Sequence, residues 1–348
     1  MNKYLYIVIF CICFSCNSKR KAENNEMYLS GKSYKFDESI LLKYPYKIQV
    51  IDSILIVWDL HSKDNFFHVF SFKDSVSKYL YSFGKLGQGP GELTACSGLE
   101  LQDGCLSFFD TNKAILYSYS IENIEKNIGK PIKSVQFPKD YVPVIQSTKM
   151  GKKGNIILES KGECRFILFD NEGNILEKCY KIPNNENKDV PNFMLQQLWS
   201  SCLSFNETNN ILVLGTKLGD VLEIYNFNEK TAKIVVGNQG EPSFFRDGKS
   251  VALMQANGYQ DVIVGDYNIY ALYSSISQKE VIESKKNGKI VPKGGNIIYV
   301  FSLDGEIKTK FILDKYINNF YIDFEKKIIY GVNPNSDIQL CIFNLPMI

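Results

Sequence analysis

The sequence has 348 residues, 40 basic and 38 acidic side chains, a formal net charge of +2 at pH 7 and an aromatic content of 13%. So balanced a charge does not predict nucleic-acid binding, which needs a clustered positive surface. The length would allow two domains, but all-β folds of this size often form one, and the many Tyr and Phe residues favour strands.

The first residues are typical of an export signal. An apolar stretch from Tyr4 to Phe14 follows the basic Lys3. Its length, about eleven residues, is that of a signal-peptide core, whereas a membrane-spanning helix needs about 20. The stretch ends in Ser15-Cys16, which resembles a bacterial lipobox and implies cleavage after Ser15 and a lipid on Cys16. The alternative is ordinary secretion, with Cys16 incidental.

A polar segment follows the cleavage site. Residues Asn17 to Asn25 contain one apolar side chain, Ala22. Such a segment cannot bury enough surface to offset its ordering entropy, so we expect residues 16–26 to form a flexible tether. Its basic residues, 19–21, lack the acidic cluster that resembles a surface-export tag, which favours the periplasmic side. The folded domain then spans residues 27–348.

The remainder of the chain is a repeat of apolar strands. The six similar strands are Phe66 to Phe72, Ile115 to Ile121, Cys164 to Asp170, Val221 to Phe227, Ile297 to Leu303 and Ile338 to Asn344. Each follows another apolar strand, and most intervals are about 40–50 residues, the period of four-stranded propeller blades. We therefore expect an all-β fold, a single six-bladed β-propeller of mostly four-stranded antiparallel blades.

The segments outside the repeat are also informative. The interval before the fifth repeated strand is long because residues 237–258 have little strand character and a Lys-rich insertion follows Ser277. We interpret both as long loops, the insertion as an exposed loop or hairpin, and not as a seventh blade. Val190 to Leu198 could form one or two helical turns. A strand within Tyr28 to Phe36 should close the ring by pairing in the last blade, because unclosed blades expose sheet edges.

Two segments carry a family resemblance. They are the loop from Phe83 to Leu93 (FGKLGQGPGEL) and the run from Tyr259 through Asp304-Gly305 to Val332. Together they resemble the TolB-like six-bladed propeller lipoproteins of Bacteroidetes, over essentially the whole mature chain. The resemblance implies a fold and an envelope location, but no reaction and no catalytic residues.

The glycine-rich loop also invites a phosphate-binding interpretation. Its glycines, 84, 87, 89 and 91, match neither the dinucleotide fingerprint nor a P-loop, and no helix begins after them. A turn between blades is the better interpretation, and a partial echo in Gly237 to Pro242 supports it. The two histidines, His61 and His68, do not suggest a catalytic triad or a zinc site.

Six cysteines remain after the N-terminal segment: Cys96, Cys105, Cys164, Cys179, Cys202 and Cys341. None is spaced as a zinc ligand pair. Cys164 and Cys179 flank the turn from Asp170 to Gly173, and a two-residue loop would place them opposite each other on a hairpin, whereas a three-residue loop would separate them. We expect free, buried thiols.

No cofactor is predicted, although an axial calcium site is an alternative. Six-bladed propellers that resemble gluconolactonases hold calcium with Glu, Asn and Asp from inner strands. Asp261, Asp266, Asn155 and Asn210 lie near the expected inner strands. Asp and Asn more often cap turns, so we assign no metal ligands.

The face where connections between blades gather is the best candidate for a binding surface. Candidate ligand-binding residues in or beside these connections are Glu92, Trp199, Glu241 and Arg246, with Phe244 and Phe245 adjacent. An aromatic and charged rim suits a protein, peptide or glycan ligand. The leading hypothesis is a non-enzymatic, membrane-tethered binding or scaffolding module. The alternatives are a metal-dependent hydrolase or lyase with its site on the axis, and an assembly component without a small ligand.

Overall fold

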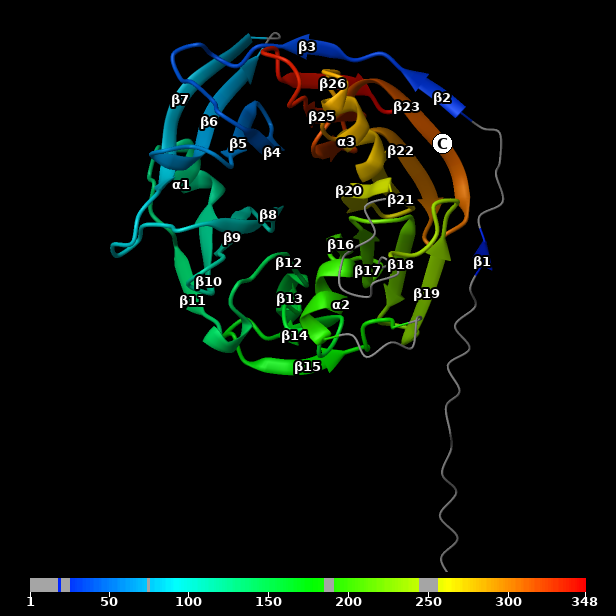
Figure 1. Cartoon of the computed structure of the whole chain (residues 1–348). Coiled ribbons are helices and arrows are strands. Elements are labelled where there is room, and N and C mark those ends of the chain that lie inside the picture. Colours follow the sequence, from blue (N-terminus) through cyan, green and yellow to red (C-terminus); the bar gives the residue numbers. More distant parts are fainter. Residues whose placement is uncertain (1–17, 20–25, 74–75, 185–190, 244–255) are drawn as a thin grey trace, which may run out of the picture.

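The computed structural model describes residues 18–19, 26–73, 76–184, 191–243 and 256–348, and it is a ring of six sheets (Figure 1). Cys16 and Arg246 lie outside the described residues, so their predicted roles stay predictions. The expectation of a six-bladed propeller with four-stranded antiparallel blades is confirmed.

In each blade, the first strand lies at the axis and the fourth strand lies at the outer edge. The first three blades are β4 (Pro45–Ile51), β5 (Ile54–Asp59), β6 (Asn65–Lys73) and β7 (Val76–Lys85); β8 (Cys96–Gln102), β9 (Cys105–Asp110), β10 (Ile115–Ser120) and β11 (Lys133–Gln136); and β12 (Ser147–Lys149), β13 (Asn155–Leu158), β14 (Phe166–Phe169) and β15 (Ile175–Cys179).

The last three blades complete the ring. They are β16 (Ser201–Asn206), β17 (Ile211–Thr216), β18 (Val221–Asn226) and β19 (Thr231–Val236); β20 (Ala256–Val264), β21 (Asn268–Ser277), β22 (Gly295–Ser302) and β23 (Ile307–Ile317); and β24 (Phe320–Asp323), β25 (Ile328–Val332), β26 (Leu340–Asn344) and β3 (Lys32–Tyr34).

An N-terminal strand closes the ring, as expected. β3 pairs antiparallel with β26, with Cys341 opposite Ser33, and so supplies the outer strand of the sixth blade. Just before it, β2 (Glu26–Leu29) runs parallel to β23 at the edge of the fifth blade. β1 (Ser18–Lys19), within the segment predicted as a tether, runs parallel to β19. The N-terminal segment therefore pairs with the outer edges of three consecutive blades.

The hydrophobic core is divided among the junctions between blades. Six clusters of buried residues each join two neighbouring blades. Between the first two blades, for example, the ring centroids of Phe67 and Phe108 lie 4.4 Å apart. The second strands are buried almost throughout, whereas the outer strand β15 is mostly exposed. Because no blade buries both of its faces alone, the blades depend on one another for stability.

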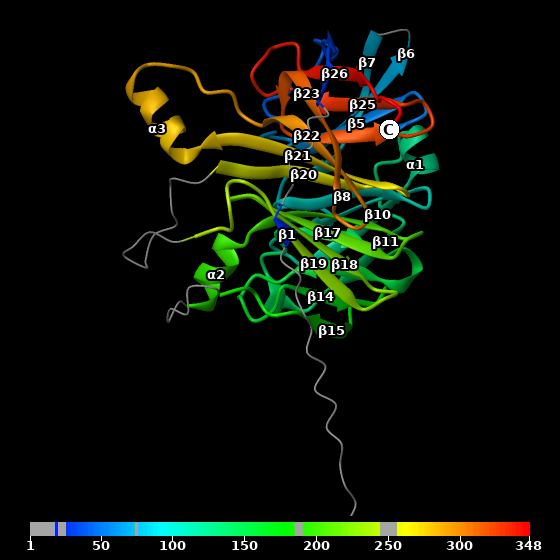
Figure 2. The same cartoon turned by 90° about the vertical axis from the view of Figure 1, so that its right-hand side faces the viewer.

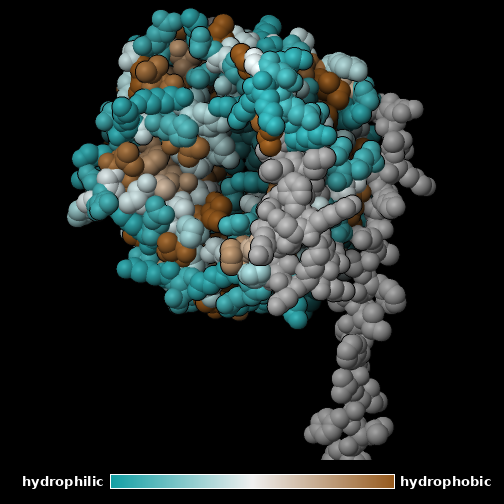
Figure 3. All heavy atoms as spheres, in the orientation of Figure 1, coloured by the Kyte–Doolittle hydropathy of each residue, from teal (hydrophilic) through white to brown (hydrophobic). Residues whose placement is uncertain are grey.

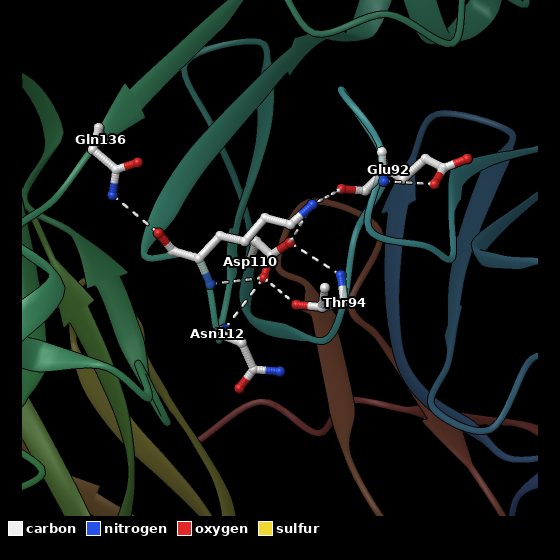
Figure 4. Close-up of polar contacts among 7 residues, drawn as sticks. Glu92, Thr94, Asp110, Asn112 and Gln136 are labelled. Carbon is white, nitrogen blue, oxygen red and sulfur yellow. Dashed lines mark hydrogen bonds and ion pairs between the residues drawn. The ribbon is translucent and has the colours of Figure 1, made fainter.

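At equivalent positions in the first and second blades, a buried carboxylate accepts hydrogen bonds from the connection that enters the blade. Asp110, the last residue of β9, accepts hydrogen bonds from the backbone N–H and the hydroxyl of Thr94 at 3.0 and 2.7 Å, and from the N–H of Asn112 (Figure 4). Asp59, the last residue of β5, accepts the N–H groups of Lys43 and Tyr44 in the same way. These carboxylates hold each incoming connection against its own blade.

The helices lie in the connections. α1 (Ile121–Glu125) follows β10, and α2 (Asn192–Leu198) confirms the one or two turns expected before the fourth blade. α3 (Gln278–Lys286) occupies the insertion of the fifth blade, where we expected a loop or hairpin; that expectation was wrong. In Figure 2, α2 and α3 project from the same side of the ring. Among the described residues, no helix is long and apolar enough to cross a bilayer.

A capping box explains α3. The Ser277 hydroxyl accepts the N–H of Glu280 at 3.1 Å, and the Glu280 carboxylate accepts the N–H of Ser277 at 2.6 Å. This reciprocal pair satisfies two backbone donors at the start of the helix. The helix has few apolar residues, so its sequence shows no apolar stripe. Its charged composition therefore gave no indication of a helix.

Candidate functional site

The axial channel is the first of two neighbouring cavities. It has a volume of about 300 Å³ and is lined by the innermost strands of all six blades. The polar residues among its lining are Lys47, Gln49, Glu100, Gln146, Ser147, Thr148, Ser204, Gln260, Asp261 and Asn319. The backbone approaches closely here: a Cβ on Gly98, which has φ +64°, would lie 1.9 Å from the Ser147 hydroxyl oxygen. Glycine is therefore required at that position.

One ion pair spans the axial channel. Lys47 of β4 and Asp261 of β20 approach to 3.9 Å between Nζ and Oδ1. Asp261 is buried, and its Oδ2 also accepts the N–H of Phe320 at 3.4 Å. Burial raises the pKa of Asp261 above its ordinary value, and Lys47 partly offsets this increase.

A second carboxyl in the axial channel is held by neighbours. Glu100 of β8 accepts the Thr148 hydroxyl at 3.0 Å and the N–H of Lys149 at 2.7 Å. Burial raises the pKa of Glu100, although these hydrogen bonds and the nearby lysines work in the opposite direction. The axial channel thus contains two carboxyls of raised pKa and one lysine.

The second cavity, which we call the vestibule, opens beside α3 at the mouth of the axial channel. Its volume is about 590 Å³, and it shares Tyr46 and Gln260 with the channel. Its lining is Tyr44, Tyr46, Lys217, Asn257, Tyr259, Gln260, Val281, Lys285, residues 289–294 and Asn318. Figure 3 views this side of the ring, where hydrophilic residues cover α3. Tyr44 and Asn318 belong to the connections that lead into β4 and β24, so the vestibule lies on the face where blades connect.

The vestibule is rich in lysine. Lys217 comes from the connection between β17 and β18, Lys285 from α3, and Lys289 and Lys293 from the segment before β22. Within the described residues, none of the four side chains forms an ion pair; the Lys293 ammonium lies 5.6 Å from the centroid of the Tyr44 ring. The positive charge of Lys217 also acts in the axial channel, where it partly offsets the rise in the pKa of Asp261 that burial causes.

Three buried polar atoms around the two cavities have no hydrogen-bond partner. They are the Nε1 of Trp58 and the Oδ1 of Asn319, both in residues that line the axial channel, and the Nδ2 of Asn318, whose residue lines the vestibule. These side chains are at most 7% exposed. A buried polar group without a partner costs about 1–3 kcal/mol, so these three side chains are energetically unsatisfied as they stand beside the cavities.

Comparison with known proteins agrees with this architecture. The model of the family TolB-like 6-blade propeller-like matches residues 22–325. The chain belongs to this family. The resemblance seen in the sequence is therefore confirmed.

Two solved structures show the same fold as this TolB-like propeller. One is a member of the DUF4221 family from Bacteroides vulgatus, with 13% identity, a TM-score of 0.53, and coverage of 92% of this chain and 98% of that chain. The other is a protein from Bacteroides fragilis that is predicted to be exported, with 12% identity, a TM-score of 0.55, and coverage of 94% and 99%. No curated protein matches the sequence.

Glu92, one of the ligand-binding residues predicted from the sequence, holds the glycine-rich loop of the TolB-like propeller. Its carboxylate accepts hydrogen bonds from the Lys85 ammonium at 2.7 Å and from the N–H of Gly89 at 2.8 Å. Lys85 is the main cause of the lowered pKa of Glu92. The loop connects β7 to β8, which agrees with its interpretation as a turn between blades. Ligand binding by Glu92 stays a prediction, but neither cavity includes it.

The other predicted binding residues also lie apart. Trp199, at the end of α2, is 2% exposed and packs with Leu195 and Leu198. The Arg165 guanidinium lies 6.0 Å from the centroid of its ring. Glu241 is half-buried in the connection after β19. The structure therefore brings neither of these two residues into the vestibule.

The structure does not bring the four residues considered for calcium together. Asp261 lines the axial channel, but Asp266 lies in the turn after β20, where it accepts the side-chain amide of Asn206 at 3.0 Å. Asn155 donates to the carbonyl of Asp170 at 3.4 Å, and Asn210 contacts Asn228. Among the described residues, no group of three or more His, Cys, Asp or Glu could hold a metal ion.

The cysteines and histidines are parts of the packing. All six cysteines, including Cys164 and Cys179, are free. Cys202 lines the axial channel, where burial raises the pKa of its thiol to about 12, so it is not a thiolate at neutral pH. His68 Nδ1 lies 2.7 Å from the Ser82 hydroxyl, and His61 stacks on Tyr44.

Sequence reasoning missed Lys47, Lys217 and Asn318. One signal for the axial channel was present: the innermost strands carry polar residues at alternate positions, as in Lys47 and Gln49 of β4. Side chains alternate between the two sides of a strand, so these positions point to a polar axis. The vestibule had no such signal, because its lysines come from distant segments and from a helix that we did not expect.

Proposed function

We propose that this protein is a non-enzymatic binding module of the cell envelope that receives its ligand in the vestibule. The observation that carries the proposal is the set of buried, unpartnered polar atoms around the two cavities, in Trp58, Asn318 and Asn319. When these side chains turn towards the cavities, a ligand that reaches from the vestibule into the axial channel can supply their partners. Binding then recovers the free energy that these groups lack in the unbound protein.

The envelope location rests on the N-terminal segment. The apolar stretch, Ser15-Cys16 and the polar tether support export, and the fold is shared with a Bacteroides fragilis protein predicted to be exported. We propose a lipid on Cys16 that holds the propeller at the periplasmic side of a membrane. Cys16→Ala should move the protein from the membrane fraction to the soluble fraction; membrane attachment that survives this substitution would refute the anchor.

Native mass spectrometry of protein purified from its own envelope tests the binding module. We expect a bound molecule that is released on denaturation, and its loss in Asn318→Leu. Asn112→Leu, in an exposed turn of the second blade, is the matched control and should keep the bound molecule. Equal retention by both variants would refute the vestibule as the binding site, provided that circular dichroism shows both folded.

A second candidate function is a hydrolase or lyase with its site in the axial channel. The favouring observation is the pair Glu100 and Asp261, because carboxyls whose pKa is raised by burial are suited to proton transfer. Turnover of a lactone, ester or glycan that survives purification and disappears in Asp261→Asn would support this function. The same result would contradict the non-enzymatic module.

A further inference from the structure

In the described part of the vestibule, the lysines without ion pairs and the Asn318 amide are hydrogen-bond donors, and this defines a ligand class. We infer that the ligand is a small, soluble anion with a carboxylate or phosphate group, and that Lys217, Lys285, Lys289 and Lys293 bind this group. The inference rests on the proposed function, because it concerns the same cavity. It adds to the proposed function the charge of the ligand and the orientation in which the ligand binds.

The positive charge of the vestibule is not neutralised by the described part of the chain. Other lysines do have carboxylate partners: Lys279 pairs with Glu283 on the outer side of α3, Lys85 with Glu92, and Lys310 with Glu26. Among the described residues, the four vestibule lysines have none. Lys217 is half-buried beside the channel mouth, where water screens charge less than on an open surface. Lysines that line one cavity, without carboxylate partners in the described part of the chain, favour an anion.

Asn318 adds an independent observation. Its Nδ2 is a buried donor without a partner, in a residue that is 7% exposed and lines the vestibule. A carboxylate or phosphate oxygen accepts hydrogen bonds only, so it matches both an amide N–H and the ammonium groups. A cationic ligand would be repelled by the lysines and would leave this donor unpaired.

The axial channel determines the orientation of the ligand. It contains two carboxyls, Asp261 and Glu100, against one lysine, Lys47, so it disfavours an anionic group. Its unpartnered atoms are one donor, Trp58 Nε1, and one acceptor, Asn319 Oδ1, which hydroxyl groups can satisfy together. The anionic end of the ligand therefore lies in the vestibule, and an uncharged, hydroxyl-bearing end points into the channel. A sugar acid has this pattern.

The shape of the vestibule favours a soluble ligand over a membrane surface. It is a concavity of about 590 Å³, bordered by Val291, Pro292 and the Tyr44 ring. A concave pocket encloses a small molecule, whereas a flat array of lipid headgroups would contact only its rim. Vesicle binding is therefore an outcome that would contradict the inference.

Isothermal titration of the mature protein with galacturonate, citrate and inorganic phosphate tests the inference, with galactose as the neutral counterpart. We expect at least one anion to bind, galacturonate more tightly than galactose, and the affinity to fall when NaCl is raised from 50 to 500 mM. Lys217→Met should weaken anion binding by about tenfold, which corresponds to about 1.4 kcal/mol. Lys286→Met is the control, because this exposed lysine of α3 does not line the vestibule, and it should leave the affinity unchanged.

The outcomes separate this inference from the proposed function. Binding of galactose with an affinity equal to that of galacturonate, unaffected by Lys217→Met, would overturn the inference and leave the binding module standing. Absence of binding for all three anions would also overturn it, while the mass-spectrometric test of a native ligand decides the binding module separately. Binding only to vesicles of anionic lipid, with no response to the three soluble anions, would overturn it in favour of a membrane contact.

Discussion

Lys47 and Asp261 face each other across the axis of the propeller, from the first and the fifth blade, with 3.9 Å between Nζ and Oδ1. The two blades are not neighbours in the ring, since β24 of the sixth blade lies between β4 and β20. Closing the ring is therefore what creates this pair. The polar axis and the vestibule beside it are consequences of the same closure.

Removing the lysine should change the titration of its partner. In Lys47→Met, the pKa of Asp261 should rise further above its ordinary value, because burial still raises it and the main opposing charge is gone. Carbon-13 NMR of the Asp261 carboxyl measures this shift. The variant should be less stable than the wild type above the folded pKa of Asp261, and the difference should shrink as pH falls through that pKa and the carboxyl becomes neutral. An unchanged pKa would show that the pair does not interact.

The junction carboxylate Asp110 should be essential for stability. Asp110→Ala leaves the N–H groups of Thr94 and Asn112 without their acceptor, so we expect a loss of at least about 3 kcal/mol in the free energy of unfolding. Urea denaturation measures it. Asn112→Ala, which keeps the backbone donor, is the control and should cost less than about 0.5 kcal/mol. Equal losses for both variants would refute the role of the carboxylate.

The buried pair Arg165–Glu223 joins the third and fourth blades. Arg165 Nε donates to Glu223 at 2.8 Å, and a terminal nitrogen of Arg165 donates to the Ser201 hydroxyl at 2.6 Å. Arg165→Leu should cost about 3–5 kcal/mol, because it leaves Glu223 charged and buried. The double variant Arg165→Leu/Glu223→Leu should recover most of this loss in denaturation experiments. A double variant less stable than the single one would contradict the explanation.

The capping box of α3 should act locally. Ser277→Ala should reduce the stability of the helix by about 1 kcal/mol and increase hydrogen exchange in residues 278–286. The global thermal midpoint should change little, because α3 projects from the ring (Figure 2). Ser284→Ala, within the same helix, should not increase exchange. Protection unchanged by the loss of Ser277 would show that the cap is not needed.

The repeat predicted the fold because it is a local signal. Strands such as Ile54–Asp59 and Cys105–Asp110 are apolar on both sides, which only stacked blades can bury, and the closing strand followed from the unpaired edge of the last blade. The loop with Glu92 was correctly predicted as a turn between blades. These features depend on residues close together in the sequence.

The site could not be predicted in the same way. The vestibule combines Tyr44, Lys217, Lys285 and Asn318, which only the closed ring brings together. Trp199 was predicted at the rim for its chemistry, but α2 packs it into a buried cluster. Aromatic and charged residues in a connection are thus weak evidence for a binding site, because packing and turn geometry require the same residue types.

A crystal structure of the mature protein with its tightest-binding anion would test whether the vestibule is the ligand-binding site. We predict that the anionic group lies within hydrogen-bond distance of Lys217 Nζ and Asn318 Nδ2, with the rest of the molecule directed into the axial channel. Anion density on the outer strands or on the opposite face of the ring, with none beside Lys217, would contradict the claim.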